Sequence, residues 1–253
     1  MTVPRILVIA GSDSGGGAGI QADIRTVTLL GGHAMTAITA ITAQNTVGVQ
    51  GVHAVPVEMV LQQMESVISD IGVDAVKIGM IGSAETAAAV ADRLAMLANV
   101  PIVFDPVMIA TSGSVLADAA TIASFERLMA IATLTTPNIP ELAALGGDEI
   151  AIRFGTHVLA KGGHGMGPML TDRLIGPHGV MKAWSNARIE TVHSHGTGCT
   201  LASAIATGLG QGWDLIDAIE RGRKYVREAL SLAPGLGRGR GPMGSPFGFH
   251  GHA

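Results

Sequence analysis

Short apolar runs that are typical of buried strands alternate along this chain with segments of helical periodicity. The strand-like runs are RILVIAG, TAITAITAQ, DAVKIGM, PIVFDP, LTTPN and HVLAKGG, and GIQADIRTVTLLGG, PVEMVLQQMESVISDI and SAETAAAVADRLAMLA are helix-like segments between them. Strands that alternate with helices form βαβ units, which build a mostly parallel sheet with helices on both faces. We therefore expect an α/β fold in a single domain over residues 1–253, with further helices after Thr197.

The composition supports one large core and argues against several classes of protein. Of the 253 residues, 47% are hydrophobic and 14% are charged, which suits a single α/β domain. No apolar run is long enough to span a bilayer, so no membrane partner is expected. A formal net charge of −4 argues against nucleic acid as the main partner. A single cysteine cannot form an internal disulfide, which indicates a reducing cytoplasm.

Seven polar or glycine-rich turns follow the strand-like runs. They are GSDSGGGAG, AQNT, KIGM, DPVM, TPNIPE, KGGH and HGTGC. Ligands of a parallel sheet bind outside the carboxyl ends of its strands, so these turns predict a site at one edge. The tail from about residue 237 to 253 is rich in glycine and of low complexity, and we expect it to be flexible at its end.

The glycine-rich loops do not favour the common nucleotide motifs. GAGIQA, residues 17–22, matches the loose dinucleotide pattern, but no acidic residue follows about 20 positions later to hold a ribose. No glycine-rich stretch ends in Gly-Lys-Ser/Thr, which excludes a Walker A loop. A dehydrogenase is therefore disfavoured.

The turn HGTGCT predicts an anion site at the start of a helix. Gly196 and Gly198 allow a tight turn whose N–H groups converge, and the helix dipole adds positive charge. Such a turn suits a transferring phosphoryl group. The same surroundings should lower the pKa of Cys199, so that this loop-tip thiol could serve as a base near neutral pH. The alternative is that Cys199 is a small buried hydrophobic residue.

Taken in order, the motifs resemble a known family of kinases. The matching pieces are IAGSDSGGGAGIQADIRT, TAITAQNTVGVQGV, VKIGMIGS, DPVMIATSG, TPNIPEL, AKGGH, HGTGCTLASAIA and GRGRGP. Together they resemble the hydroxymethylpyrimidine/phosphomethylpyrimidine kinases of the ribokinase-like superfamily. The resemblance implies a three-layer αβα sandwich with a central, mainly parallel sheet. It also implies ATP-dependent phosphorylation of 4-amino-5-hydroxymethyl-2-methylpyrimidine, and then of its monophosphate to the pyrophosphate, in thiamine biosynthesis.

The resemblance further implies ATP and Mg²⁺ as cofactors, a homodimer, and roles for particular residues. Many relatives carry aspartate at the position of Cys199, so the thiol would replace a carboxylate base. The catalytic group implied is Cys199, the amides of Gly196, Thr197 and Gly198, and Lys161. The pyrimidine would be bound by Gly11, Asp23, Gln44, Met80 and Val107, and ATP by Asn138, Lys161, His195 and Thr197. Magnesium would be organised by Asp105, Asn138 and Glu141, directly or through water.

Several of these residues could instead have an ordinary structural role. Gln44 can read an aminopyrimidine edge because its amide offers both a donor and an acceptor, but it could equally be an ordinary strand-end residue. Met80 could simply pack in the core. Asp105 could accept turn hydrogen bonds, Lys161 could be solvated, and His195 could be exposed to solvent.

One segment departs from the family pattern, and two other functions stay open. The stretch between Asn138 and Lys161 leaves room for little more than a short helix after Pro140 and the strand before Lys161. This predicts that the protein segment beside the ATP site is smaller than in the family. The nearest rival function is a pyridoxal or pyridoxine kinase, whose substrate also carries a hydroxymethyl group on a flat heterocycle. The other is a catalytically silent pyrimidine-binding protein on the same fold.

Overall fold

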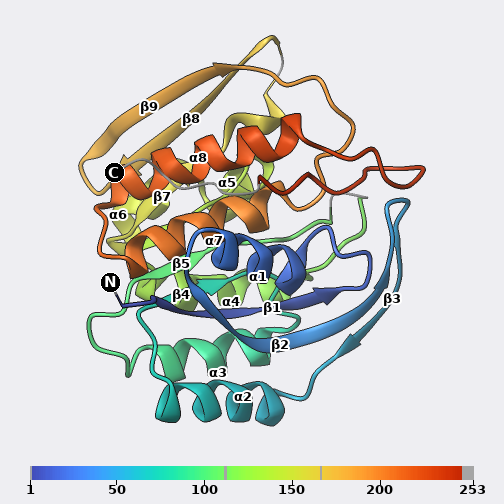
Figure 1. Ribbon diagram of the computed structural model, residues 1–253. Helices are drawn as coiled ribbons and strands as arrows, with labels where there is room; N and C mark the ends of the chain where they lie inside the picture. The colour runs from blue at the N-terminus through green and yellow to red at the C-terminus, as the bar shows by residue number, and fades with distance from the viewer. Residues whose placement is uncertain (1, 111–112, 166, 247–253) are drawn as a thin grey trace.

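The computed structural model describes residues 2–110, 113–165 and 167–246, which form a nine-stranded sheet with helices on both faces (Figure 1). The strand order is β3-β2-β1-β4-β5-β6-β7-β8-β9. The strands are β1 (Arg5–Asp13), β2 (His33–Gln44), β3 (Val49–Ala54), β4 (Ala75–Ile78), β5 (Ile102–Phe104), β6 (Leu134–Thr135), β7 (His157–Ala160), β8 (Met169–Gly176) and β9 (Gly179–Ala187).

The helices alternate with these strands along the chain. They are α1 (Gly19–Leu29), α2 (Val57–Asp70), α3 (Ala84–Leu94), α4 (Ala119–Ile131), α5 (Ile139–Leu145), α6 (Ile150–Phe154), α7 (Thr197–Gly210) and α8 (Leu215–Ser231), with 3-10 turns η1 (Gly147–Glu149) and η2 (Gly162–His164). In the part of the chain that the structure describes, no helix is both long and apolar enough to cross a membrane.

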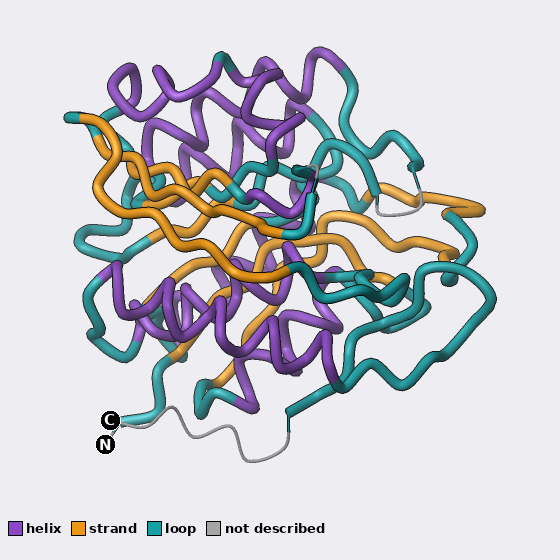
Figure 2. The backbone as a smooth tube through the Cα atoms, turned by 90° about the horizontal axis from the view of Figure 1, so that it is seen from above, coloured by secondary structure: helices purple, strands orange, loops and turns teal. Residues whose placement is uncertain are grey.

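The sheet is parallel in its centre and antiparallel at its edges. β2, β1, β4, β5, β6 and β7 pair in parallel, whereas β3, β8 and β9 pair antiparallel with their neighbours. Seen from above, helices lie on both sides of the strands (Figure 2). The predicted three-layer αβα sandwich with a mainly parallel sheet is therefore confirmed.

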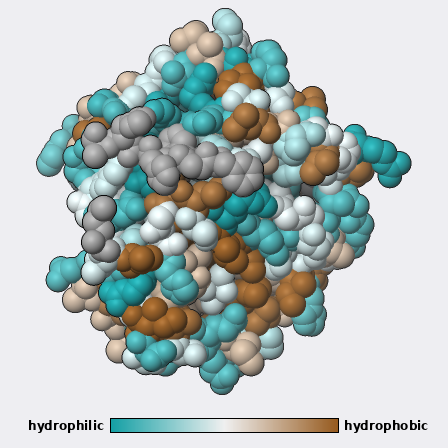
Figure 3. Space-filling model, in the orientation of Figure 1, coloured by the Kyte–Doolittle hydropathy of each residue, from teal (hydrophilic) through white to brown (hydrophobic). Residues whose placement is uncertain are grey.

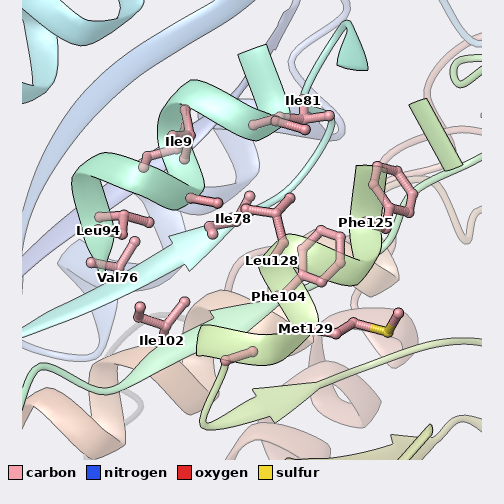
Figure 4. Packing of buried hydrophobic residues seen from close by; sticks show 14 of the residues in the cluster. Ile9, Val76, Ile78, Ile81, Leu94, Ile102, Phe104, Phe125, Leu128 and Met129 are labelled. Carbon is pink, nitrogen blue, oxygen red and sulfur yellow. The ribbon is translucent and has the colours of Figure 1, made fainter. Parts of the chain in front are cut away.

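Alternation along the strands builds a core on each face of the sheet. In β1, Leu7 and Ile9 pack with α2, α3 and α4, whereas Ile6 and Val8 pack with α1, α7 and α8. Phe104 lies in the first of these clusters, where its ring meets Phe125 edge to face at 5.2 Å between centroids (Figure 4). On the face shown in Figure 3, exposed hydrophobic residues form several separate groups, as is usual for protein surfaces.

The strand-like and helix-like segments singled out in the sequence are confirmed, but four elements were not anticipated. These are β3, α4 and the β8–β9 hairpin, and β3 and β9 are largely exposed strands without a strong apolar pattern. Between Asn138 and Lys161 the chain forms the expected short helix α5, and also η1 and the one-turn helix α6. That segment therefore holds slightly more structure than expected.

The described part of the glycine-rich tail is anchored rather than free. The N–H of Arg240 donates to the carbonyl of Thr46 at 2.9 Å, and the N–H of His195 donates to the carbonyl of Gly241 at 3.2 Å. Pro242 forms a parallel bridge with His195. The tail thus joins the loop after β2 to the turn before α7 as far as residue 246, and residues 247–253 lie outside the described part.

Replacing Phe104 should strongly destabilise the fold. The ring is fully buried, and Phe104→Ala should lower the free energy of unfolding by about 3–5 kcal/mol, because it removes apolar contacts and leaves a cavity. Urea unfolding followed by circular dichroism measures this loss. Met96→Ala is the control, since Met96 is 77% exposed and should change stability by less than about 0.5 kcal/mol. Equal losses in both variants would contradict the assigned core.

Candidate active site

The carboxyl ends of the six parallel strands meet at one edge of the sheet. The strand order reverses at β1, because β2 lies on one side of it and β4 on the other. Crevices at such a reversal are where parallel sheets bind ligands. The loop after β1, Met80 after β4, Asp105 after β5 and Lys161 after β7 all lie at this edge, as expected.

Asp13 organises the glycine-rich loop after β1. Its carboxylate accepts hydrogen bonds from the N–H groups of Gly15 at 2.8 Å, Gly17 at 3.0 Å and Ala18 at 2.8 Å. Burial alone would raise the pKa of Asp13, but the bond to His195 and the N–H groups outweigh it and lower the pKa. The sequence reasoning missed this residue. An aspartate at a strand end before a glycine run is the signal that could have found it.

His195 is buried, with 8% of its surface exposed, so the solvent-exposed alternative is wrong. Its Nε2 lies 2.9 Å from the Asp13 carboxylate and 3.1 Å from the side-chain nitrogen of Gln44. Gln44 is also tied to the first loop, because its backbone N–H and carbonyl both bond the hydroxyl of Ser14 at 2.8 Å. Gln44, which was predicted to bind the pyrimidine, is therefore in contact with His195, which was predicted to bind ATP.

The HGTG turn packs directly against the first loop. Gly196 has φ +87°, and a Cβ there would collide with the carbonyl oxygen of Gly17, so glycine is required on both counts. Helix α7 begins at Thr197, as predicted. Cys199 lies inside the first turn of this helix and is half-buried, which corrects the expected loop-tip position.

An ion pair lies beneath the turn. Lys161 Nζ contacts Asp105 Oδ1 at 2.7 Å, and the hydroxyl of Thr136 donates to the same oxygen at 3.0 Å. A Cβ on Gly198 would lie 3.0 Å from Asp105 Oδ2 and 3.3 Å from Lys161 Nζ. Burial alone would lower the pKa of Lys161, but the carboxylates of Asp105 and Glu141 outweigh it and raise the pKa. A charged ammonium group thus lies next to the HGTG turn.

Asn138 and Glu141 form a capping box at the start of α5. The side-chain oxygen of Asn138 accepts from the N–H of Glu141 at 2.9 Å, and a carboxylate oxygen of Glu141 accepts from the N–H of Asn138 at 2.8 Å. Burial raises the pKa of Glu141, and this outweighs the opposing effect of Lys161. Over residues 2–110, 113–165 and 167–246, no group of three or more His, Cys, Asp or Glu side chains could hold a metal ion.

Asp23 is not open to a ligand, which corrects its predicted contact with the pyrimidine. Its carboxylate is completely buried, where it pairs with Lys77 at 2.8 Å and accepts the hydroxyl of Ser203 at 2.7 Å. Gly11 and Met80 do come together, since a Cβ on Gly11 would lie 3.1 Å from the Met80 sulfur. Val107 is half-buried beside Asp105, whose carbonyl accepts its N–H at 2.8 Å.

The resting thiol of Cys199 is not the low-pKa group that the turn predicted. Burial raises its pKa to about 11, and the carboxylates of Asp23 and Asp105 act in the same direction. The ammonium group of Lys77 and the N–H of Gly19 oppose this rise without cancelling it. The expectation fails mainly because burial disfavours the thiolate, and the carboxylates of Asp23 and Asp105 add to this effect.

Known proteins share both the sequence and the fold of this chain. A hydroxymethylpyrimidine/phosphomethylpyrimidine kinase of Rhizobium meliloti is 47% identical, and the match covers 94% of this chain and 95% of the relative. The chain spans only 35% and 51% of two longer thiamine biosynthesis proteins, the multifunctional ThiED of Corynebacterium efficiens and the bifunctional ThiED of Geobacter sulfurreducens.

Solved structures agree with these sequence relatives. A phosphomethylpyrimidine kinase of Clostridium difficile superposes with a TM-score of 0.75 at 35% identity, covering 89% of this chain and 100% of that one. A Staphylococcus aureus pyridoxal kinase with AMP-PCP and pyridoxal gives a TM-score of 0.88 at 26% identity, over 97% and 95% of the two chains. The family model described as phosphomethylpyrimidine kinase matches residues 13–244, so the chain belongs to the phosphomethylpyrimidine kinase family.

Proposed function

We propose that this protein is an ATP-dependent kinase that phosphorylates 4-amino-5-hydroxymethyl-2-methylpyrimidine and then its monophosphate, giving the pyrophosphate used for thiamine. The observation that carries the proposal is the placement of the Gly196–Cys199 turn directly over the Lys161–Asp105 ion pair. Gln44, Gly11 and Met80 lie at the same edge of the sheet. There Gln44 could hydrogen-bond the edge of a flat ring, and Gly11 and Met80 could pack against the ring. Membership of the phosphomethylpyrimidine kinase family supports the same substrate class.

The chain's own residues can stabilise phosphoryl transfer mainly by position and charge. The N–H groups of residues 196–199 would bind the transferring phosphoryl group, and Lys161 would neutralise phosphate charge. Cys199 would take the proton of the hydroxymethyl group as its thiolate, after its own proton has passed to water. A thiol with a raised pKa is rarely ionised at neutral pH, but its thiolate is the stronger base once formed.

The ATP phosphates would lie against the turn, near Thr197 and Lys161, with Asn138 and His195 at its borders. Magnesium, when bound, would supply further neutralisation of the ATP phosphates. The carboxylates of Asp105 and Glu141 suit a hydrated Mg²⁺ held through water, because Lys161 and the capping box already occupy one oxygen of each. In this proposal Asn138 contributes to the Mg²⁺ site indirectly, because its capping-box hydrogen bonds fix the position of Glu141.

The proposal includes a single kinase domain over residues 1–253, a homodimer and a cytoplasmic location. The free thiol fits a reducing compartment. A pyridoxal kinase is the second candidate function, since pyridoxal kinases are among the solved structures with this fold. ATP consumption with the pyrimidine, its monophosphate and pyridoxal, measured side by side, tests the choice. A higher kcat/KM for pyridoxal would overturn the main proposal, and tight pyrimidine binding without turnover would indicate a silent binding protein.

Removing the thiol should slow the reaction without abolishing binding. Cys199→Ala should lower kcat by about 10²–10⁴, the usual effect of losing a positioned base, with little change in the KM for ATP. Cys199→Asp should recover part of this loss, because a carboxylate can accept the same proton. Steady-state kinetics with the pyrimidine alcohol measures both variants. A kcat near wild type for Cys199→Ala would show that the thiol is only a packing residue.

Gln44→Ala should weaken pyrimidine binding specifically. Losing the paired hydrogen bonds to a desolvated ring edge should cost about 1–3 kcal/mol, or roughly 5–150-fold in Kd, while ATP binds as before. Calorimetric titration of each ligand measures the two affinities. Gln50→Ala is the matched control, since Gln50 lies on the exposed strand β3 and its side-chain N–H donates to the carbonyl of Gly48 at 2.8 Å. Equal pyrimidine affinity in the Gln44 variant and wild type would show that Gln44 does not bind the pyrimidine.

A further inference from the structure

The contact between His195 and Gln44 brings two hydrogen-bond donors together. The Nε2 of His195 lies 2.9 Å from a carboxylate oxygen of Asp13 and 3.1 Å from the side-chain nitrogen of Gln44. The same Asp13 oxygen accepts the N–H groups of Gly17 and Ala18, which favours the charged carboxylate. A carboxylate has no hydrogen to give, so Nε2 of His195 must carry the hydrogen of this contact. The amide nitrogen of Gln44, which can only donate, therefore faces another donor.

Turning the Gln44 amide over by half a turn removes this conflict. The oxygen and the nitrogen of an amide occupy nearly equal space, so the hydrogen bonds of the neighbours decide which end faces them. With its oxygen toward His195, the Gln44 amide accepts the hydrogen of Nε2. Its nitrogen then faces the hydroxyl of Thr42, which lies 3.3 Å from the other end of the amide.

Thr42 favours the same orientation of the amide. Its hydroxyl lies 2.9 Å from the carbonyl of Ser12, which can only accept, so the single hydroxyl hydrogen is used there. Toward Gln44 the hydroxyl oxygen can then only accept, and the amide nitrogen is the end that donates. Both neighbours are buried, since Thr42 is 5% exposed and His195 is 8% exposed. Two buried partners, one at each end, thus hold the amide in one orientation.

The held orientation limits what Gln44 can bind. The amide has two hydrogens and two lone pairs, and the bonds to Thr42 and His195 use one of each. Gln44 is half-buried, so its remaining N–H and lone pair can face a ligand in a fixed order. A 4-aminopyrimidine presents a ring-nitrogen acceptor next to an amino donor, whereas a 4-oxopyrimidine presents an N–H donor next to a carbonyl acceptor. An amide that could turn over would match both orders, but a held amide matches only one.

We propose that His195 is a positioning residue that sets substrate specificity. Together with Asp13, it holds the Gln44 amide with the oxygen toward His195, so that the site accepts a 4-aminopyrimidine and rejects the 4-oxo counterpart. The meaning for specificity rests on the proposed function, whereas the orientation of the amide does not. In this role His195 acts through Gln44, independently of any contact with ATP.

The test compares two ligands by calorimetric titration in the absence of ATP. They are 4-amino-5-hydroxymethyl-2-methylpyrimidine and its analogue with an oxo group in place of the amino group. Wild type should bind the amino compound about 5–150-fold more tightly, as expected when buried hydrogen bonds are mismatched. His195→Leu should lower this ratio severalfold, because only Thr42 then holds the amide. His195→Gln should keep the ratio near that of wild type, because its side-chain N–H can replace that of Nε2.

A ratio near one in wild type, or an unchanged ratio in His195→Leu, would overturn the proposal. An equal loss of the ratio in His195→Gln and His195→Leu would also overturn it, since that result indicates a packing role for the ring. His53→Leu is the matched control, because His53 is exposed on strand β3. Its ratio should equal that of wild type.

The orientation of the amide is also tested without substrate, by ¹⁵N NMR of the histidine-labelled protein. The ring signal that His195→Gln removes belongs to His195, and its Nε2 should carry a hydrogen. A bare Nε2 would overturn the proposal even if the amino compound binds more tightly. Should His195→Leu fail to fold, the wild-type ratio and this ring signal decide. Binding of neither pyrimidine by wild type would instead overturn the proposed function, and the ring signal would still decide the orientation.

Discussion

The site depends on the close contact between the first glycine-rich loop and the turn before α7. These segments lie 182 residues apart at the His195–Asp13 contact, and glycine at 196 lets the turn reach the carbonyl of Gly17. Asp13 holds its own loop through three N–H groups and holds the turn through His195. One buried carboxylate thus fixes both the turn before α7 and, through His195, the position of Gln44.

Much of the fold follows from local patterns that a sequence shows directly. Buried parallel strands are continuous apolar runs, so β1, β4 and β5 were recognisable. The side chain of Asp118 caps the start of α4, and this local signal was overlooked. The β8–β9 hairpin was not recognisable, because its outer strand is mostly exposed and stays in place through contacts from α8 to Trp184 and Lys182. Such contacts depend on tertiary structure rather than on periodicity.

The positions of several predicted site residues followed from the sequence, whereas their electrostatics did not. Strand-end positions correctly brought Gly11, Met80, Asp105 and Lys161 to one edge. The pKa of Cys199 was predicted wrongly, since the helix terminus is visible in the sequence whereas the burial of the thiol is not. Lys77 was read only as part of a strand. A charge in the middle of an apolar strand indicates a buried partner, but the partner's identity needs the fold.

The anchored tail has a consequence for how the protein is made. Backbone bonds from Arg240 to Thr46 and from His195 to Gly241 close the site with residues from near the end of the described chain. During synthesis the β1–β2 region leaves the ribosome long before these partners exist. The sheet centre can form early, whereas the edge that holds Gln44 and His195 must wait for the tail. A segment made well after the sheet therefore completes this edge.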